Sequence, residues 1–181
     1  MGALWFGIFE FLTELCNMKH IKFIFTFLLI SLVSGYTYGQ NAEASQPIKW
    51  RMSVKMTSPK SGTVTLRAII DPGWHLYGMT LPKNGPVPTT FDFSASRGIE
   101  FTENSFTPAR PTQQKDDPNF GIKIGAWEKE ITFTRHFVLT GKIEDALVSG
   151  TVRFMGCNDK NCLPPKTQTF KTSPKPFNPT K

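Results

Sequence analysis

Two cysteines close together near the C-terminal end carry the most recognisable chemistry in this sequence. Cys157 and Cys162 bracket a polar loop of four residues, 158–161, and an apolar strand pattern precedes them. Thiol–disulfide exchange needs an accessible sulfur and a second cysteine close enough to resolve the mixed disulfide. A loop between two paired strands holds both, so the sequence predicts a hairpin that carries a redox-active cysteine pair.

A small structural disulfide is the alternative use of the same pair, and the spacing alone favours neither use. The ring that the pair would close is short, and a short ring stabilises a fold less than a long one in the chain-entropy model. No helix is expected after Cys162, because Pro164 and Pro165 follow it, so the helix N-terminus that lowers a thiol pKa in thioredoxin-type sites is absent. Lys160 favours a thiolate only modestly, and we expect a thiol that reacts when a partner docks.

Other chemistries find less support in the residues. Soft ligands suited to copper(I) are present, but they form no His-rich or Met-rich cluster, so a copper-binding protein is the weaker alternative and we expect no cofactor or metal. These ligands are Cys157, Cys162, Met155, Met79, His75 and His136. No serine has the context of a nucleophile elbow, and no glycine-rich loop is suited to holding phosphate.

The charge and the aromatic content argue against nucleic acid as a partner. The formal net charge is +7, but the basic residues are scattered singly and form no stripe. Sixteen phenylalanines are typical of a sandwich core. Trp50, Trp74 and Trp127 leave a sugar-binding or adhesion sandwich open, although burial in the core is the more common fate of a tryptophan.

The N-terminal segment has the order of a secretory signal peptide. A short basic segment, 19–22, precedes the apolar run 23–33, and small and polar residues follow. The run is shorter than the roughly 20 residues of a membrane span, although an uncleaved anchor is the alternative. The acids within 1–17 are unusual before a signal and favour Met18 as the true start. We therefore expect a leader over 1–40 and export to the periplasm.

The third cysteine lies within this leader. Glu14 stands two residues before Cys16, and the apolar run follows the cysteine instead of preceding it, which argues against lipid attachment. The mature chain then holds Cys157 and Cys162 alone. Two cysteines in an exported chain favour an oxidised pair.

Alternation of apolar and polar residues predicts strands along most of the mature chain. The clearest runs are 62–70, 127–139 and 147–155, in which residues of one parity would face a core. Shorter candidates are 48–56, 74–77, 89–93, 99–102 and 167–171. Fourteen prolines and fourteen glycines argue against long helices.

This pattern predicts an all-β protein with the architecture of an immunoglobulin-like β-sandwich. About eight short strands separated by turns fit that fold and its length. We expect the sandwich to span 41–172 and a Pro-rich tail, extended or disordered, to span 173–181. Cysteines this close cannot join two sheets, so the pair is not the inter-sheet disulfide of immunoglobulin domains.

The cysteine segment resembles that of the N-terminal periplasmic domain of DsbD, the thiol:disulfide interchange protein. The resemblance rests on Phe154-Met155-Gly156-Cys157 followed by Cys162-Leu163-Pro164-Pro165. Two further segments occur in the family's order, and they are Gly73-Trp74-His75-Leu76-Tyr77 and Asn119-Phe120. The resemblance covers 48–171.

The resemblance implies an immunoglobulin-like sandwich that relays electrons. A membrane-embedded thiol reductase would reduce the cysteine pair, which would then reduce thioredoxin-fold periplasmic proteins, either disulfide isomerases or cytochrome c maturation thioredoxins. Cys162 is implied to form the mixed disulfide with a partner and Cys157 to resolve it. Phe120 is implied to cap the disulfide. The residues implied to line the site are His75, Tyr77, Pro164 and Pro165.

We therefore expect a monomeric protein-disulfide reductase. A non-enzymatic binding or structural sandwich with an inert disulfide is the alternative. The membrane-spanning and thioredoxin-like domains of the full interchange protein are not found in this sequence, so its electron donor is expected to be a separate protein.

Three departures from the family pattern bear on the site. The loop between the cysteines is one residue shorter than in the best-known members, and Leu163 stands where the family has an aromatic residue. Pro118 and Asn119 occupy the two positions before Phe120 at which the family has acids, while Asp116 and Asp117 lie slightly upstream. The sequence therefore does not place a carboxylate beside the thiols.

Overall fold

The computed structural model describes residues 46–179, so the expected leader over 1–40 lies outside the described residues. Within them, every regular element is a strand except the short 3-10 turn Ile143–Asp145, and no helix there is long and apolar enough to cross a membrane. The strands are β1 (Ile48–Met56), β2 (Ser61–Ile70), β3 (His75–Tyr77), β4 (Thr90–Asp92), β5 (Ile99–Phe101), β6 (Thr107–Pro108), β7 (Gln113–Asp117), β8 (Ile122–Trp127), β9 (Glu130–Leu139), β10 (Val148–Phe154), β11 (Gly156–Cys157) and β12 (Lys166–Thr172).

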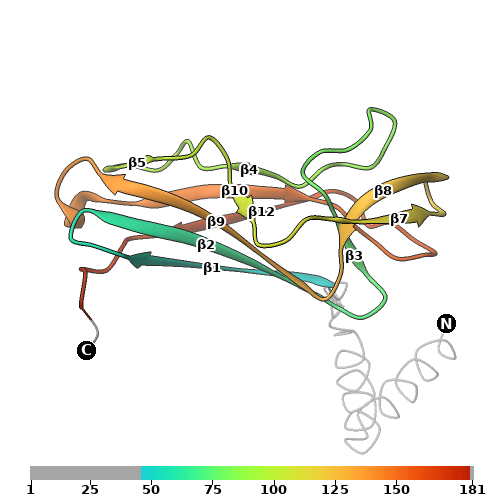
Figure 1. The fold of residues 1–181 in the computed structure, drawn as a ribbon, viewed down its shortest axis with the longest axis horizontal. Coiled ribbons are helices and arrows are strands. Elements are labelled where there is room, and N and C mark those ends of the chain that lie inside the picture. Colours follow the sequence, from blue (N-terminus) through green and yellow to red (C-terminus); the bar gives the residue numbers. More distant parts are fainter. Residues whose placement is uncertain (1–45, 180–181) are drawn as a thin grey trace, which may run out of the picture. The chain divides into compact units, whose positions relative to one another are not determined.

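Two antiparallel sheets form the sandwich (Figure 1). The first has the order β1-β2-β9-β5, with β6 paired to β9, and the second has the order β12-β10-β4. Buried side chains from both sheets form one apolar cluster between them. The all-β sandwich that the sequence predicted is confirmed.

Alternation places one face of each central strand in this core. The buried residues are Val64, Leu66, Ala68 and Ile70 on β2, and Ile131, Phe133 and Phe137 on β9. Phe133 is central to an aromatic group, since its ring centroid lies 5.8 Å from that of Trp50, 5.2 Å from that of Trp127 and 5.0 Å from that of Phe91. Trp50 and Trp127 therefore contribute to the core, which is the more common position of a tryptophan, and Trp74 also packs against it.

A third sheet, with the order β11-β3-β8-β7, lies at one end of the sandwich, away from β5 (Figure 1). The sequence did not separate it from the first sheet, because the predicted strand 127–139 begins too early: residues 130–139 form a strand as expected, but Trp127 belongs to the strand before it. The chain leaves β8 at Trp127 and starts β9 at Glu130, and Lys129 between them has a φ of 67°. Trp127 and Ile131 are both buried in the same core cluster, so the apolar alternation runs through the break without revealing it.

The sequence also did not predict β7, the outer strand of the third sheet. β7 reads Gln-Gln-Lys-Asp-Asp and shows no apolar alternation. It is a strand because it pairs with β8 over its whole length, from Gln113 opposite Ala126 to Asp117 opposite Ile122. Its C-terminal residue, Asp117, is buried, and this brings a carboxylate into the end of the sandwich.

The close approach of β10 to the β4 region provides a test of this packing. A Cβ added at Gly150 would overlap the Asp92 carbonyl oxygen and the Phe93 ring. We expect Gly150→Ala to lower the free energy of unfolding by about 1–3 kcal/mol, measured by urea denaturation, because overpacking shifts a buried ring and a backbone. Gly141→Ala is the matched control, since nothing lies within 4 Å of its added Cβ. Equal stability of the two variants would contradict the described packing.

Candidate redox site

The cysteine segment lies where the chain leaves one sheet for another. β10 pairs with β12 up to Phe154 opposite Lys166, which forms the predicted hairpin. After Phe154 the chain turns to the third sheet, where β11 pairs with β3 and Cys157 lies opposite His75. Gly156 permits this route, because an added Cβ would lie 2.6 Å from a side-chain carbon of Ile48.

The two cysteines form a disulfide with a Cα–Cα distance of 4.1 Å. The loop between them is held by its own hydrogen bonds. The Asn158 side-chain oxygen accepts from the backbone N–H of Lys160 at 2.9 Å and of Asn161 at 2.7 Å. The Asn158 backbone N–H donates to the Asn161 carbonyl at 2.9 Å. The short loop is therefore a defined turn that presents the disulfide.

The two sulfur-bearing residues differ in exposure. Cys157 is fully buried, at 0% exposure, whereas Cys162 is partly exposed. Both belong to a small apolar cluster with Tyr77 and Phe120 that is separate from the main core. A partner thiolate or disulfide could reach Cys162, but not Cys157, without a change in structure.

A buried carboxylate is linked to Cys162 through the hydroxyl group of Tyr77, a link that the sequence did not predict. The Tyr77 hydroxyl donates a hydrogen bond of 2.5 Å to Asp117 Oδ2 and lies 3.8 Å from Cys162 Sγ. Burial, together with this hydrogen bond and the carboxylate charge, raises the pKa of Tyr77. The Asp117 side chain is only 2% exposed, so the site holds a nearly dry tyrosine–carboxylate pair.

Asp117 also shapes the turn that carries the cap residue. Its Oδ1 accepts from the backbone N–H of Asn119 at 2.9 Å and of Phe120 at 3.3 Å. Burial alone would raise the pKa of Asp117, but the hydrogen bonds from Tyr77 and from these two amides outweigh burial, so its pKa lies below the ordinary value. The run Asp-Pro-Asn-Phe-Gly at 117–121 is the sequence signal that could have revealed this turn. An aspartate at the start of such a turn accepts a hydrogen bond from the backbone N–H two residues later.

Phe120, implied to be the cap, lies beside the disulfide in the small apolar cluster. Its ring meets that of Tyr77 edge to face, with centroids 6.1 Å apart. The Asn119 side-chain amide donates to the Asn158 carbonyl at 2.9 Å, which joins the cap turn to the cysteine loop. An ion pair of 3.0 Å between Lys115 on β7 and Asp159 adds a second connection.

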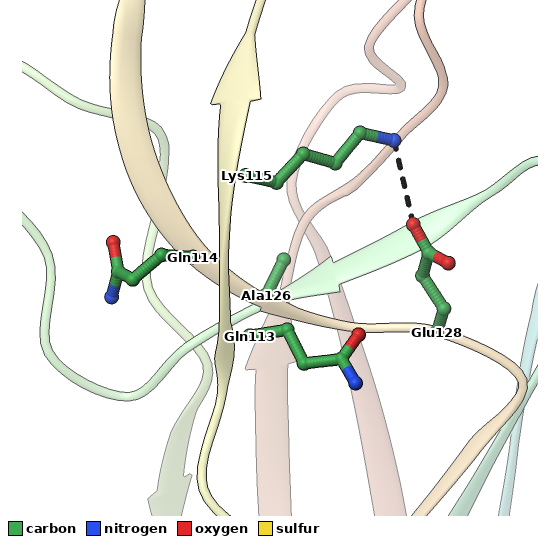
Figure 2. A pocket seen from close by; sticks show the side chains of 5 residues that line it. All are labelled: Gln113, Gln114, Lys115, Ala126 and Glu128. Atoms are coloured by element: carbon green, nitrogen blue, oxygen red, sulfur yellow. Dashed lines mark hydrogen bonds and ion pairs between the residues drawn. The ribbon is translucent and has the colours of Figure 1, made fainter.

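Lys115 faces two acidic side chains. Besides Asp159, its ammonium group pairs with Glu128 at a distance of 3.4 Å. Figure 2 shows this pair. The hydrogen bond to Asp159 is the main reason that the pKa of Lys115 lies above its ordinary value. The lysine is partly exposed, so each pair contributes about 0–1 kcal/mol and serves mainly to position the loop.

His75 lies at the inner side of the site and is 1% exposed. Its Nε2 lies 3.3 Å from Asp117 Oδ2, and its ring centroid lies 5.0 Å from that of Tyr77. Burial, with a smaller effect of the Lys115 charge, lowers the pKa of His75. Its Nδ1 is buried without a hydrogen-bond partner among the described residues.

The structure brings some of the expected lining residues together and not others. Tyr77 and Phe120 pack in the same small cluster as the disulfide, and His75 is the strand partner of Cys157. Pro164 and Pro165 are exposed residues that follow Leu163. Of the soft ligands considered for copper, Cys157, Cys162 and Met155 belong to the small apolar cluster, where the two cysteines are joined as a disulfide. His136 lies elsewhere and pairs with Glu103 on the surface of β9. Among residues 46–179, no group of three or more His, Cys, Asp or Glu side chains could hold a metal ion.

The Asp117 contacts predict how stability depends on pH. The folded-state pKa of Asp117 lies below its unfolded value of about 3.9. The carboxylate therefore stabilises the fold above about pH 4, and this stabilisation is lost as the pH falls through the folded-state pKa. We expect Asp117→Asn to lower the free energy of unfolding at pH 7 by about 2 kcal/mol and to depend less on pH between about 2 and 4, as measured by urea denaturation.

The neighbouring acid supplies the control for that change. Asp116 is exposed on the same strand, and Asp116→Asn should reproduce the wild-type acid profile. An Asp117→Asn profile that runs parallel to the wild-type curve would show that the carboxylate is not held as described.

Comparison with known proteins agrees with the fold and shows the family. Residues 42–174 match the family described as "Thiol:disulfide interchange protein DsbD, N-terminal". The N-terminal periplasmic domain of ScsB from Proteus mirabilis is a similar solved structure, with a TM-score of 0.51 and 15% sequence identity over 71% of this chain and 47% of that chain. This chain thus spans about half the length of that structure, and the likeness concerns the fold alone. No curated protein matches the sequence. The family match covers most of the chain, which therefore belongs to the DsbD N-terminal domain family of thiol:disulfide interchange proteins.

Proposed function

We propose that this chain is a periplasmic electron relay that passes two electrons from a membrane-embedded thiol reductase to disulfides of thioredoxin-fold proteins. Disulfide isomerases and cytochrome c maturation thioredoxins are the proposed acceptors, and the chain acts as a monomer. Membership of the interchange family supports the reaction class. The signal-like sequence before residue 41 supports the periplasmic location.

The observation that carries the proposal is the unequal exposure of the two cysteines. Cys162 is partly exposed beside the cap residue, and Cys157 is buried behind it. A disulfide that only braces a turn needs no such difference. An exchange reaction does, because one sulfur must meet the partner and the other must stay ready to release it.

The reaction proceeds in two displacements. The Cys162 thiolate attacks one sulfur of the partner's disulfide, a mixed disulfide forms, and the other partner sulfur leaves as a thiolate. The Cys157 thiolate then attacks Cys162 Sγ, the intramolecular disulfide forms, and the second partner sulfur leaves. The pair loses two electrons, and the partner's disulfide gains them and takes up two protons.

The buried carboxylate moderates the reactivity of Cys162. Asp117 and Cys162 both contact the Tyr77 hydroxyl. The negative charge of Asp117 therefore disfavours a second negative charge on the Cys162 sulfur. Docking of a partner, with displacement of the Phe120 ring, would expose the sulfur at the moment of exchange.

Trapping experiments test the division of roles. Cys157→Ser should accumulate a mixed disulfide through Cys162 when mixed with an oxidised thioredoxin-fold protein, because nothing remains to resolve it. Cys162→Ser leaves only the buried sulfur and should form at least about tenfold less adduct. Non-reducing gel electrophoresis with mass spectrometry measures both. An adduct that forms mainly with Cys162→Ser would reverse the roles, and no adduct with either variant would contradict exchange.

Removing the cap ring should expose the disulfide to small reductants. The edge-to-face contact between Phe120 and Tyr77 is worth about 0.5–1.5 kcal/mol. Its loss in Phe120→Ala should raise the rate of reduction by dithiothreitol by about 2- to 10-fold. Ile122→Ala is the matched control, since Ile122 is an exposed apolar residue of the same hairpin. An unchanged rate in Phe120→Ala would show that the ring does not shield the pair.

A further inference from the structure

One buried titratable side chain has no part in the reaction as described above. His75 is 1% exposed, and its Nδ1 has no hydrogen-bond partner among the described residues. An unpaired polar atom in a dry site is unfavourable and calls for an explanation, and a catalytic role is one such explanation. The position of His75 suggests what that function is.

The second displacement requires a buried thiol to lose its proton. Cys157 is 0% exposed, so solvent hydroxide reaches it poorly. Burial in apolar surroundings raises the pKa of a thiol, yet only the thiolate attacks a disulfide. Without an internal base, resolution of the mixed disulfide would be slow at neutral pH.

The strand register places His75 beside that thiol. Cys157 on β11 is the antiparallel partner of His75 on β3, and Cys162 is in turn the bridge partner of Cys157. Directly opposed residues of antiparallel strands project from the same face, with Cβ atoms about 4.5–5.5 Å apart. The imidazole and both sulfurs therefore share one face of the third sheet.

The contact with Asp117 selects which ring nitrogen is the base. An ionised carboxylate can only accept a hydrogen bond, and His75 Nε2 lies 3.3 Å from Asp117 Oδ2, so Nε2 carries the proton that it donates. In the neutral imidazole this leaves the lone pair on Nδ1, the nitrogen that has no partner. A base oriented by a carboxylate is the arrangement that enzymes use to activate a cysteine or serine nucleophile.

We propose that His75 is the base that takes the proton from the Cys157 thiol when Cys157 resolves the mixed disulfide, a role that rests on the exchange function proposed above. The Cys157 S–H bond breaks and the Nδ1–H bond forms. The Cys157 sulfur bonds to Cys162 Sγ, and the bond between Cys162 and the partner breaks. The departing partner thiolate receives the proton from the imidazolium or from water, so charge and electrons balance. In the reverse direction the imidazolium protonates the Cys157 thiolate as it leaves.

The charges around His75 suit a neutral imidazole at pH 7. Asp117 and Lys115 on β7 face the imidazole, and so do Asp159 in the cysteine loop and Tyr77 on the strand of His75 itself. Burial and the Lys115 ammonium lower its pKa and outweigh the two carboxylates. The imidazole is thus free to accept a proton, and Asp117 stabilises the imidazolium formed during the step.

The two displacements can be timed separately with a small aromatic disulfide. Reduced protein mixed with excess dithiobis(nitrobenzoate) releases one thionitrobenzoate as Cys162 attacks and a second as Cys157 resolves the adduct. We expect His75→Gln to slow the second release by about 100-fold at pH 7 while changing the first by less than about threefold. The glutamine amide keeps a donor for Asp117 but cannot act as a base. His136→Gln, on the exposed histidine of β9, is the matched control and should leave both phases unchanged.

The pH profile distinguishes a base from a packing residue. In wild type the second phase should be nearly level from about pH 7 to 8, where His75 is neutral, whereas in His75→Gln it should rise about tenfold per pH unit, so that the deficit shrinks at high pH. A wild-type second phase that itself rises tenfold per unit, or a His75→Gln variant slowed equally in both phases, would overturn the proposal. A wild-type pair that releases no thionitrobenzoate would instead overturn the exchange function, and the base with it.

Discussion

The Asp117 carboxylate accepts hydrogen bonds from the Tyr77 hydroxyl and from the backbone amides of Asn119 and Phe120, and His75 Nε2 lies within reach of the same group. These contacts join β3, the end of β7 and the cap turn at one point. A buried carboxylate without partners would cost several kcal/mol, and the surrounding donors offset that cost. The position of the cap ring, the orientation of the histidine and the polarity around Cys162 all depend on this one group.

The carboxylate also explains why the site can be both closed and reactive. The cap turn is fixed to Asp117 from inside and to the cysteine loop through Asn119 and Asn158 from outside. The outer contacts are exposed and weak, whereas the inner ones are buried and charge-assisted, with roughly twice the strength of neutral hydrogen bonds. A docking partner can therefore displace the outer contacts without disturbing the groups that govern proton transfer.

The sequence predicted the sandwich well where burial alone sets the pattern. On β2, the residues Val64, Leu66, Ala68 and Ile70 alternate with polar residues, so both the strand and its buried face could be predicted. The strand break at Lys129 could not, because Trp127 and Ile131 keep the same parity on either side of a change of sheet. β7 was missed because its stability comes from pairing with β8 and not from its own apolar residues.

In the site, too, some features could be predicted from the sequence and others could not. The cysteine pair and the Gly73–Tyr77 segment are contiguous motifs and could be recognised. The position of Asp117 in the site could not be predicted from its distance in sequence to Phe120. A turn folds the chain back at Asp117, and the folded chain brings its carboxylate to the Tyr77 hydroxyl. The unequal burial of Cys157 and Cys162 depends on the apolar cluster around them, which combines residues far apart in the chain.

The central claim is that the cysteine pair is redox-active and not a brace. A ring this small supplies only about 2 kcal/mol in the chain-entropy model, and the aromatic core around Phe133 does not include the pair. The most direct measurement is the reduction potential of the Cys157–Cys162 disulfide, obtained by equilibration with glutathione or thioredoxin buffers. We predict a value between about −270 and −180 mV, within the range of proteins that exchange disulfides. A value below about −300 mV, typical of structural disulfides, would contradict the relay.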